Sequence, residues 1–203
     1  MVTEIRLYIE GGGDSRDTKA FLRQGFSIFF GQIVQRARNK NVRWQLIMCG
    51  SRNSAFDAFR TSVRQRPDTF HVLLIDAEGP VQATPWDHLR QRGEWHGDGA
   101  HDEHCHLMVQ TMEAWFVADI KVLVAFYGAG FNANHIPRNP DVEQISKDQL
   151  RTSLRAASSC TQKGEYHKIQ HAYKLLGMID VGTVREASRH CDRLFVTLTA
   201  KMA

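Results

Sequence analysis

The sequence predicts an α/β fold, with a mostly parallel four-stranded sheet flanked by helices and a helical C-terminal extension. Strand-like and helical patterns alternate along residues 1–130, which is typical of parallel strands joined by crossover helices. The strand-like stretch at residues 70–75 is apolar on both sides, as expected of a central strand covered by helices on both faces. Residues 131–203 carry helical patterns after a linker, and we expect them to pack on the first part as one unit.

The first strand and the first helix follow from alternation and from a cap. Residues 3–10 alternate apolar and polar side chains, which predicts a strand. The sequence GGGDS comes next, and either Asp14 or Ser15 can cap a helix. The apolar positions of this helix continue to about residue 38, so we expect one uninterrupted helix here.

The next strand, helix and strand repeat this order. Residues 44–50 (WQLIMCG) predict a second strand. Ser51 can cap a second helix, which Pro67 ends. The third strand, at residues 70–75, completes a strand–helix–strand–helix–strand order, and this order is what predicts a parallel sheet.

The part of the chain after the third strand is less regular. Residues 81–103 are polar and rich in Gly, His and Trp, so we interpret them as an irregular excursion with a short helix near residues 86–91. Residues 105–111 predict a fourth strand, and residues 113–127 predict a helix that ends at Gly128. In the extension, Thr183 and Glu186 resemble a capping box at the start of a last helix, with apolar residues at helical spacing after it.

Composition and charge allow a nucleic-acid partner without requiring one. The 203 residues carry a formal net charge of +4, and the basic residues are spread along the chain. No run of about 18 apolar residues is found, so we expect no membrane span. The charged N-terminal stretch is unlike a signal peptide, and the four cysteines form no CxxC pair, which favours free thiols in the cytoplasm.

Four carboxylates follow the predicted strands. Glu10 ends the first strand, Asp76 and Glu78 end the third, and Glu113 follows the fourth. The carboxyl ends of parallel strands share one edge of a sheet, where open α/β folds bind their ligands. Like charges at one edge repel each other, and a divalent cation such as Mg²⁺ removes the conflict.

The metal interpretation has plain alternatives. Acids at strand ends also cap helices, pair with arginine or face solvent, and Glu113 alone is a favourable first-turn acid of a helix. Taken together, Glu10, Asp76 and Glu78 favour a metal site in which Mg²⁺, or Mn²⁺ in its place, could activate water against a phosphodiester.

These acids carry a resemblance to a known domain. Glu10 followed by glycines, with Asp76-Ala77-Glu78 at the third strand, resembles the Toprim catalytic domain, a Rossmann-like fold of topoisomerases, bacterial primases, recombination mediators and overcoming-lysogenisation nucleases. The usual Toprim pattern is Asp-x-Asp, so Glu78 is one methylene longer. A narrower resemblance, to domain-of-unknown-function family 4276, covers nearly the whole chain. It rests on the stretches IEGGGDS, GSRNSAFDAF, LLIDAEGPV, HLMVQTMEAWFVAD and EYHKIQHAYKLLGMID.

The resemblance implies a Mg²⁺-dependent nuclease that hydrolyses DNA or RNA. It carries over Glu10, Asp76 and Glu78 as metal ligands and Glu113 as a further catalytic residue. Members of the family are often encoded beside ATPases in prokaryotic mobile-element or phage-defence settings, so it implies a partner ATPase; self-association stays open. Two rivals are a non-catalytic Toprim-shaped module that regulates the ATPase, slightly favoured by Glu78, and a hydrolase of small phosphate esters.

Two basic residues are candidates for holding phosphate. Arg52, at the end of the second strand, matches the family pattern, and a salt bridge to a rim acid is an equal alternative. Lys168 lies in a basic and aromatic stretch, residues 163–174, with Tyr166 and His171. Contact with a nucleic-acid backbone is one interpretation of this stretch, and a solvated helix face is the favoured one.

Two other motifs have weaker interpretations. Gly11–Gly13 lack the rest of a P-loop, so a tight turn after Glu10 is favoured over a nucleotide cradle. The stretch at residues 96–106 contains four histidines and three acids, which raises zinc binding or a general base as alternatives to a polar loop. Its irregular spacing favours the polar loop.

Overall fold

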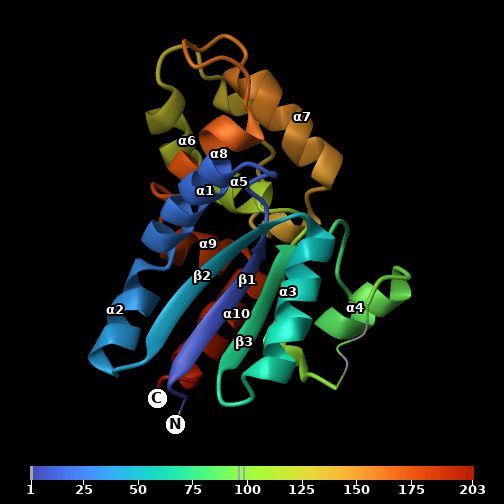
Figure 1. Ribbon diagram of the computed structural model, residues 1–203. Helices are drawn as coiled ribbons and strands as arrows, with labels where there is room; N and C mark the ends of the chain where they lie inside the picture. Colours follow the sequence, from blue (N-terminus) through green and yellow to red (C-terminus); the bar gives the residue numbers. More distant parts are fainter. Residues whose placement is uncertain (1, 96, 98) are drawn as a thin grey trace.

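The computed structural model describes residues 2–95, 97 and 99–203 and confirms the predicted α/β architecture (Figure 1). Four strands form a parallel sheet in the order β2-β1-β3-β4. The strands are β1 (Glu4–Glu10), β2 (Arg43–Gly50), β3 (Phe70–Asp76) and β4 (Cys105–Met108).

Helices connect the strands and make up the C-terminal extension. Those before β4 are α1 (Arg16–Phe29), α2 (Gly31–Asn39), α3 (Arg52–Gln65) and α4 (Pro85–Gln91). Those after it are α5 (Glu113–Ala118), α6 (Ile120–Tyr127), α7 (Lys147–Ser158), α8 (Lys168–Leu176), α9 (Val181–Ala187) and α10 (Arg189–Ala200). Short 3-10 turns are η1 (Asp102–His104), η2 (Ala133–His135) and η3 (Val142–Gln144).

Helices cover both faces of the sheet, which is why β3 is apolar on both sides. Leu73 and Ile75 pack into a cluster with α3 and α4 on one face. Val72 and Leu74 point to the other face, into the larger cluster that the remaining helices form. Every residue of β3 is buried, and the strand lies between β1 and β4, so its predicted central place is confirmed.

The extension shares the larger core. Leu150 of α7, Leu175 of α8 and Leu194 of α10 are fully buried in the same cluster as the β1 side chains. Trp115 of α5 is also fully buried and stacks on Phe29 at a ring-centroid distance of 5.0 Å. No helix within the described ranges has the length and apolar character needed to cross a bilayer.

Two predicted helices are interrupted in the structure. The first divides at Phe30, which ends α1 and donates its N–H to the Phe26 carbonyl. The predicted helix 113–127 divides at Asp119, because the Asp119 carboxylate accepts from the N–H of Val122, at 3.2 Å, and from that of Asp180, at 3.0 Å. A capping side chain that also binds a distant segment starts a new helix instead of continuing the old one.

Two other predicted boundaries are wrong. The fourth strand ends at Met108, three residues early, although the chain stays beside the segment after β3: the Met108 carbonyl accepts from Ala77 N–H at 2.9 Å. The capping box at Thr183 is also wrong, since α9 begins at Val181 and the Asp180 carboxylate accepts from Thr183 N–H at 2.8 Å. Ser188 then caps α10 separately.

The strand order places a topological switch between β1 and β3. From β1 the chain crosses through α1 and α2 to β2 on one side, and it returns through α3 to β3 on the other side of β1. The connections therefore leave the two central strands in opposite directions and open a crevice at their carboxyl ends. Glu10 is the last residue of β1 and Asp76 is the last residue of β3, so both lie at this crevice.

Candidate metal centre

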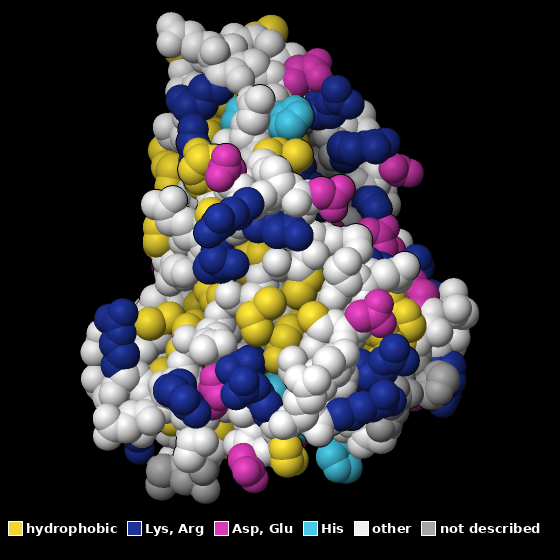
Figure 2. Space-filling view, viewed as in Figure 1, with side chains coloured by type: hydrophobic (Ala, Val, Ile, Leu, Met, Phe, Trp, Pro, Cys, Tyr) yellow, Lys and Arg dark blue, Asp and Glu magenta, His cyan; other side chains and the backbone are white. Residues whose placement is uncertain are grey.

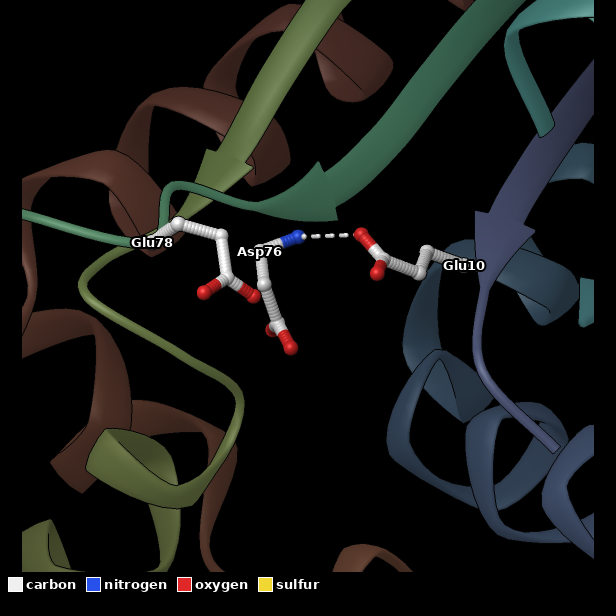
Figure 3. Close-up of side chains that lie close together, drawn as sticks. All are labelled: Glu10, Asp76 and Glu78. Atoms are coloured by element: carbon white, nitrogen blue, oxygen red, sulfur yellow. Dashed lines mark hydrogen bonds between the residues drawn. The ribbon is translucent and has the colours of Figure 1, made fainter. Parts of the chain in front are cut away.

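Three carboxylates meet at the switch point. Glu10, Asp76 and Glu78 each offer an oxygen, and these oxygens lie within 4.8 Å of one another. Figure 3 shows the Asp76 and Glu78 side chains on one side of the cluster, with Glu10 reaching toward them from β1. A Glu10 oxygen also accepts from the backbone N–H of Asp76 at 3.1 Å, which fixes the two strand ends to each other.

The backbone at Glu78 adopts a conformation that side chains rarely take. Glu78 has φ +63°, in the left-handed region, although it is not a glycine. Such a residue costs about 1–2 kcal/mol relative to an ordinary conformation. Its N–H donates to the Gln110 carbonyl at 2.8 Å, so pairing with the chain after β4 holds the strained turn in place. The turn keeps the Glu78 carboxylate beside Asp76.

Glycines let the chain turn away directly after Glu10, which confirms the tight-turn interpretation. Gly11 has φ +118° and pairs with Gly50 through hydrogen bonds of 2.8 and 3.1 Å. A Cβ atom on Gly50 would lie 2.7 Å from the Gly13 carbonyl oxygen, closer than real contacts allow. The Thr18 hydroxyl donates to the Gly12 carbonyl and ties the turn to α1.

Each acid of the cluster contacts a basic side chain. Arg52 lies 3.3 Å from Glu10, Lys168 lies 3.2 Å from Asp76, and Lys147 pairs with Glu78. Lys147 and Lys168 come from α7 and α8 of the extension, so the extension supplies charges to a site that the sheet builds. These pairs offset part of the repulsion among the acids.

Arg52 is held mainly as a salt-bridge partner. Its Nε and Nη2 donate to one oxygen of Glu94 at 2.8 and 2.6 Å, and its Nη1 donates to Glu10 and to the Asp76 carbonyl. The guanidinium also lies 5.4 Å from the ring centroid of Trp95. Of the two interpretations of Arg52, the structure therefore contains the salt bridge.

Glu113 lies next to the cluster without joining the three acids. It is 7% exposed and accepts a hydrogen bond from the Tyr166 hydroxyl at 3.0 Å. The Lys168 ammonium lies 3.7 Å from Glu113 and 3.2 Å from Asp76, so it bridges the two carboxylates. Glu113 therefore contacts the acid cluster only indirectly, by its ion pair with Lys168.

Burial and like charge shift the titration of the cluster. Burial, together with the nearby Asp76 carboxylate, raises the pKa of Glu10 to about 7. Burial also raises the pKa of Asp76, although Lys168 opposes the shift. For Lys168 burial acts to lower the pKa, but the Asp76 and Glu113 carboxylates outweigh it and raise the pKa above its usual value. The positive charge near Glu10 and Asp76 is thus too small to offset their burial and mutual repulsion. Lys168, by contrast, is held as an ammonium.

The donor set fits a hard divalent cation. All three groups supply oxygen, which suits Mg²⁺ or Mn²⁺ better than zinc. Oxygens that share one octahedral Mg²⁺ at about 2.1 Å lie about 3.0–4.2 Å apart, so oxygens that already lie within 4.8 Å of one another could converge on one ion through side-chain shifts of about 1 Å or less. The residues Glu10, Asp76 and Glu78 therefore fit such an ion.

The described residues of the histidine-rich stretch form no comparable centre. Among the described residues, no group of three or more His, Cys, Asp or Glu side chains other than this acid cluster lies close enough to share a metal. His104 contacts the His71 carbonyl at 2.6 Å, and buried His106 contacts the Glu103 carbonyl at 3.1 Å. His96 and Asp98, which belong to the predicted stretch, lie outside the described residues.

The solvated-face interpretation of residues 163–174 is wrong for its aromatic members. Tyr166 is 7% exposed and His171 is 6% exposed, because both pack into the core beneath α8. Ile169 of the same stretch is 48% exposed. Lys168, at the first position of α8, points at the acids.

The sequence did not identify three of the contact residues. Lys147, Glu94 and Tyr166 each bind a predicted site residue, but they lie in segments whose docking depends on distant contacts. The only local signal was the closeness of Tyr166 to Lys168 in the sequence.

The comparisons with known proteins identify a family. The family model described as "Domain of unknown function (DUF4276)" matches residues 9–199, a range that contains every candidate site residue. No curated protein and no solved structure matches the chain. Because the family match covers nearly the whole sequence, as the resemblance predicted, the chain belongs to the DUF4276 family.

Proposed function

We propose that this protein is a divalent-metal-dependent phosphodiesterase that cleaves DNA or RNA, with Mg²⁺ or Mn²⁺ as the cofactor. The observation that carries the proposal is the cluster of Glu10, Asp76 and Glu78 at the switch point of a parallel sheet. Open α/β folds place ligand sites there, and an all-carboxylate site prefers hard metal ions and their phosphate ligands. The Toprim resemblance of the same residues supports the assignment.

The side chains have separate roles in this proposal. Glu10, Asp76 and Glu78 would hold the ion, which when bound would polarise the phosphodiester and acidify a water molecule. Lys168 is 48% exposed at its side chain, so its ammonium can also reach a phosphate oxygen near Asp76. Glu113, held by Tyr166, is a positioning residue for Lys168.

Arg52 has a positioning role as well. Its guanidinium connects Glu10 to Glu94 and to the carbonyl of Asp76, so it holds the ends of β1 and β3 at a fixed separation. Because the guanidinium is engaged by these groups, we assign phosphate contact to Lys168 in the first place and not to Arg52.

A second candidate function is a non-catalytic module that regulates a partner ATPase. One observation favours it: each of the three acids already contacts a basic side chain. A protein that never binds metal would keep those ion pairs permanently. The two functions therefore differ in whether a divalent ion displaces the lysines.

The test combines metal binding with cleavage. Mn²⁺ is titrated calorimetrically into the wild type and into each variant. Plasmid DNA and a short RNA are then incubated with each protein and Mg²⁺ or Mn²⁺. Glu10→Gln and Asp76→Asn should lose both metal binding and cleavage, whereas Glu186→Gln, an exposed acid of α9, should keep both. Equal cleavage by every variant would trace the activity to a contaminant. If the wild type binds no metal, yet binds an ATPase encoded beside it, the result would favour the regulatory module instead.

A further inference from the structure

A basic groove lies on one side of the acid cluster. A cavity of about 440 Å³ is lined by Lys147, Arg151 and Arg155 of α7, by Lys168, and by four further residues: Thr111, Glu113, Tyr166 and His167. The three α7 residues are spaced four apart, so they lie on one face of the helix. Figure 2 shows dark-blue basic side chains along the upper right of the molecule, where Figure 1 draws α7.

The dimensions of this row fit a nucleic-acid backbone. Eight residues of α-helix separate Lys147 from Arg155, which is a rise of about 12 Å. Successive phosphates of one strand are about 3.4 Å apart along a duplex axis and farther apart in an extended strand, so the row spans about two to four phosphates. At one end of the row, Lys147 pairs with Glu78 of the acid cluster. The row therefore leads to the candidate metal centre.

The arginines of the row are available to a ligand. Arg151 pairs with Asp148 at 3.6 Å and Arg155 pairs with Glu165 at 3.0 Å, and more than half of each arginine side chain is exposed. Exposed ion pairs of this kind contribute little to stability, because water and salt compete with them. A phosphate can replace the carboxylate partner of each arginine at small cost.

A second cavity of different character lies on the other side of Lys168. It measures about 450 Å³, and both Lys168 and His167 also line the basic groove, so the two cavities adjoin at the start of α8. Its wall combines the backbone of Gly11–Gly13 with apolar side chains such as Met112 and Tyr173. Glu10 lines it as well, but most of the wall is apolar, which suits a nucleobase that has left its stack better than a phosphate.

We propose that the substrate is a single nucleic-acid strand that lies across the acid cluster. Its phosphates follow α7 through the basic groove, and one unpaired base occupies the glycine-walled cavity. This inference rests on the proposed phosphodiesterase function and adds its substrate class. A duplex fits less well, because Asp76 is only 3% exposed. The phosphates of a duplex would have to enter between the two cavities while the bases of the duplex stay paired.

The experiment measures binding without cleavage. Fluorescently labelled single-stranded DNA, single-stranded RNA and duplex DNA of one sequence are titrated in EDTA, and anisotropy is followed at several salt concentrations. Either single strand should bind more tightly than the duplex, and the DNA and RNA arms identify which sugar is preferred. The double variant Arg151→Ala, Arg155→Ala should weaken single-strand binding about tenfold. It should also reduce the slope of log Kd against log salt concentration by about 1.4, which is about 0.7 for each lost phosphate contact.

Two controls isolate the groove and the base cavity. Arg36→Ala with Arg38→Ala removes the same charge from exposed positions of α2, at the other end of the molecule in Figure 1, and should bind like the wild type. A single strand without bases should bind about tenfold more weakly than the normal strand, with an unchanged salt dependence. Thermal unfolding of both double variants should match the wild type.

The outcomes separate this inference from the proposed function. If the α7 variant binds single strands as tightly as the wild type, or if the duplex binds best, the groove proposal is overturned while metal-dependent cleavage can still stand. If the wild type binds single strands through α7 but neither binds metal nor cleaves, the strand-binding surface stands and the phosphodiesterase falls.

Discussion

Glu10→Gln should stabilise the metal-free protein at alkaline pH, although it removes a proposed metal ligand. A pKa of about 7 in the folded protein, against 4.5 for an ordinary glutamate, means that the folded state binds a proton more tightly than the unfolded state. The free energy of unfolding therefore falls as pH rises from about 4.5 through 7, and the whole loss is present at pH 8. At 1.36 kcal/mol per pH unit, the loss is roughly 3 kcal/mol.

A neutral glutamine carries no such charge. Glu10→Gln should therefore be more stable than the wild type by up to about 3 kcal/mol at pH 8, and nearly equal to it at pH 4.5. Urea unfolding in EDTA at both pH values gives the two differences. With Mn²⁺ present at 100 times its Kd, the wild type should gain about 2.7 kcal/mol and the variant nothing.

Glu4, at the opposite end of the same strand, supplies a matched control. Burial opposes ionisation of Glu4, but Arg6 and Arg43 outweigh it and lower its pKa. Its stabilising effect is present above its ordinary pKa and is lost as pH falls through the lowered value. Glu4→Gln should therefore destabilise the protein at pH 8, opposite in sign to Glu10→Gln. If Glu10→Gln is no more stable than the wild type at pH 8, the electrostatic account of the site is refuted.

Three further changes probe other contacts. Lys168→Met should raise the affinity for Mn²⁺ about fivefold, because no ammonium then competes for Asp76. The same change should slow cleavage on the order of 10²-fold, because a phosphate contact is lost. Calorimetry and initial rates measure the two effects, and a purely structural role of Lys168 would lower both the affinity and the rate. Glu78→Gly should raise the free energy of unfolding by about 1 kcal/mol in EDTA, because glycine tolerates φ +63°. The same change should weaken Mn²⁺ binding. An unchanged midpoint of urea unfolding would argue against strain at this turn. Glu143→Gln should cost about 3 kcal/mol in the same urea assay, because this buried carboxylate accepts from Ser188 and from His190 where the extension joins the core; a loss below 1 kcal/mol would contradict that role.

The sheet and its acids could be predicted because their pattern is local. The alternation of β1 and the apolar run of β3 identify parallel strands, and the carboxyl ends of such strands share one edge. Glu10 and Asp76 could thus be brought together without knowledge of any long-range contact. The turn at Glu78 could not, since its conformation depends on the chain after β4, whose carbonyl at Gln110 holds it.

The basic half of the site depends on contacts between distant segments. Lys147 and Lys168 come from helices that are docked by buried leucines of the extension, and no local pattern tells which exposed lysine of an amphipathic helix will face the sheet. The break at Asp119 has the same origin, since its carboxylate binds the backbone of Asp180, sixty-one residues away. Periodicity extends a helix past such a residue because periodicity contains no information about its distant partner.

The two ends of β1 differ in charge balance, and this difference is why we propose a cation at the carboxyl end. At the amino end, Glu4 alone faces two arginines, Arg6 and Arg43, so positive charge is in excess and the carboxylate is stable when ionised. At the carboxyl end, the four acids Glu10, Asp76, Glu78 and Glu113 contact three basic side chains, and Arg52 is shared with Glu94. Negative charge is in excess there, and the burial of Asp76 and Glu113 weakens its screening by water. A divalent ion would reverse this imbalance, and the released lysines would then face whatever anion the ion binds.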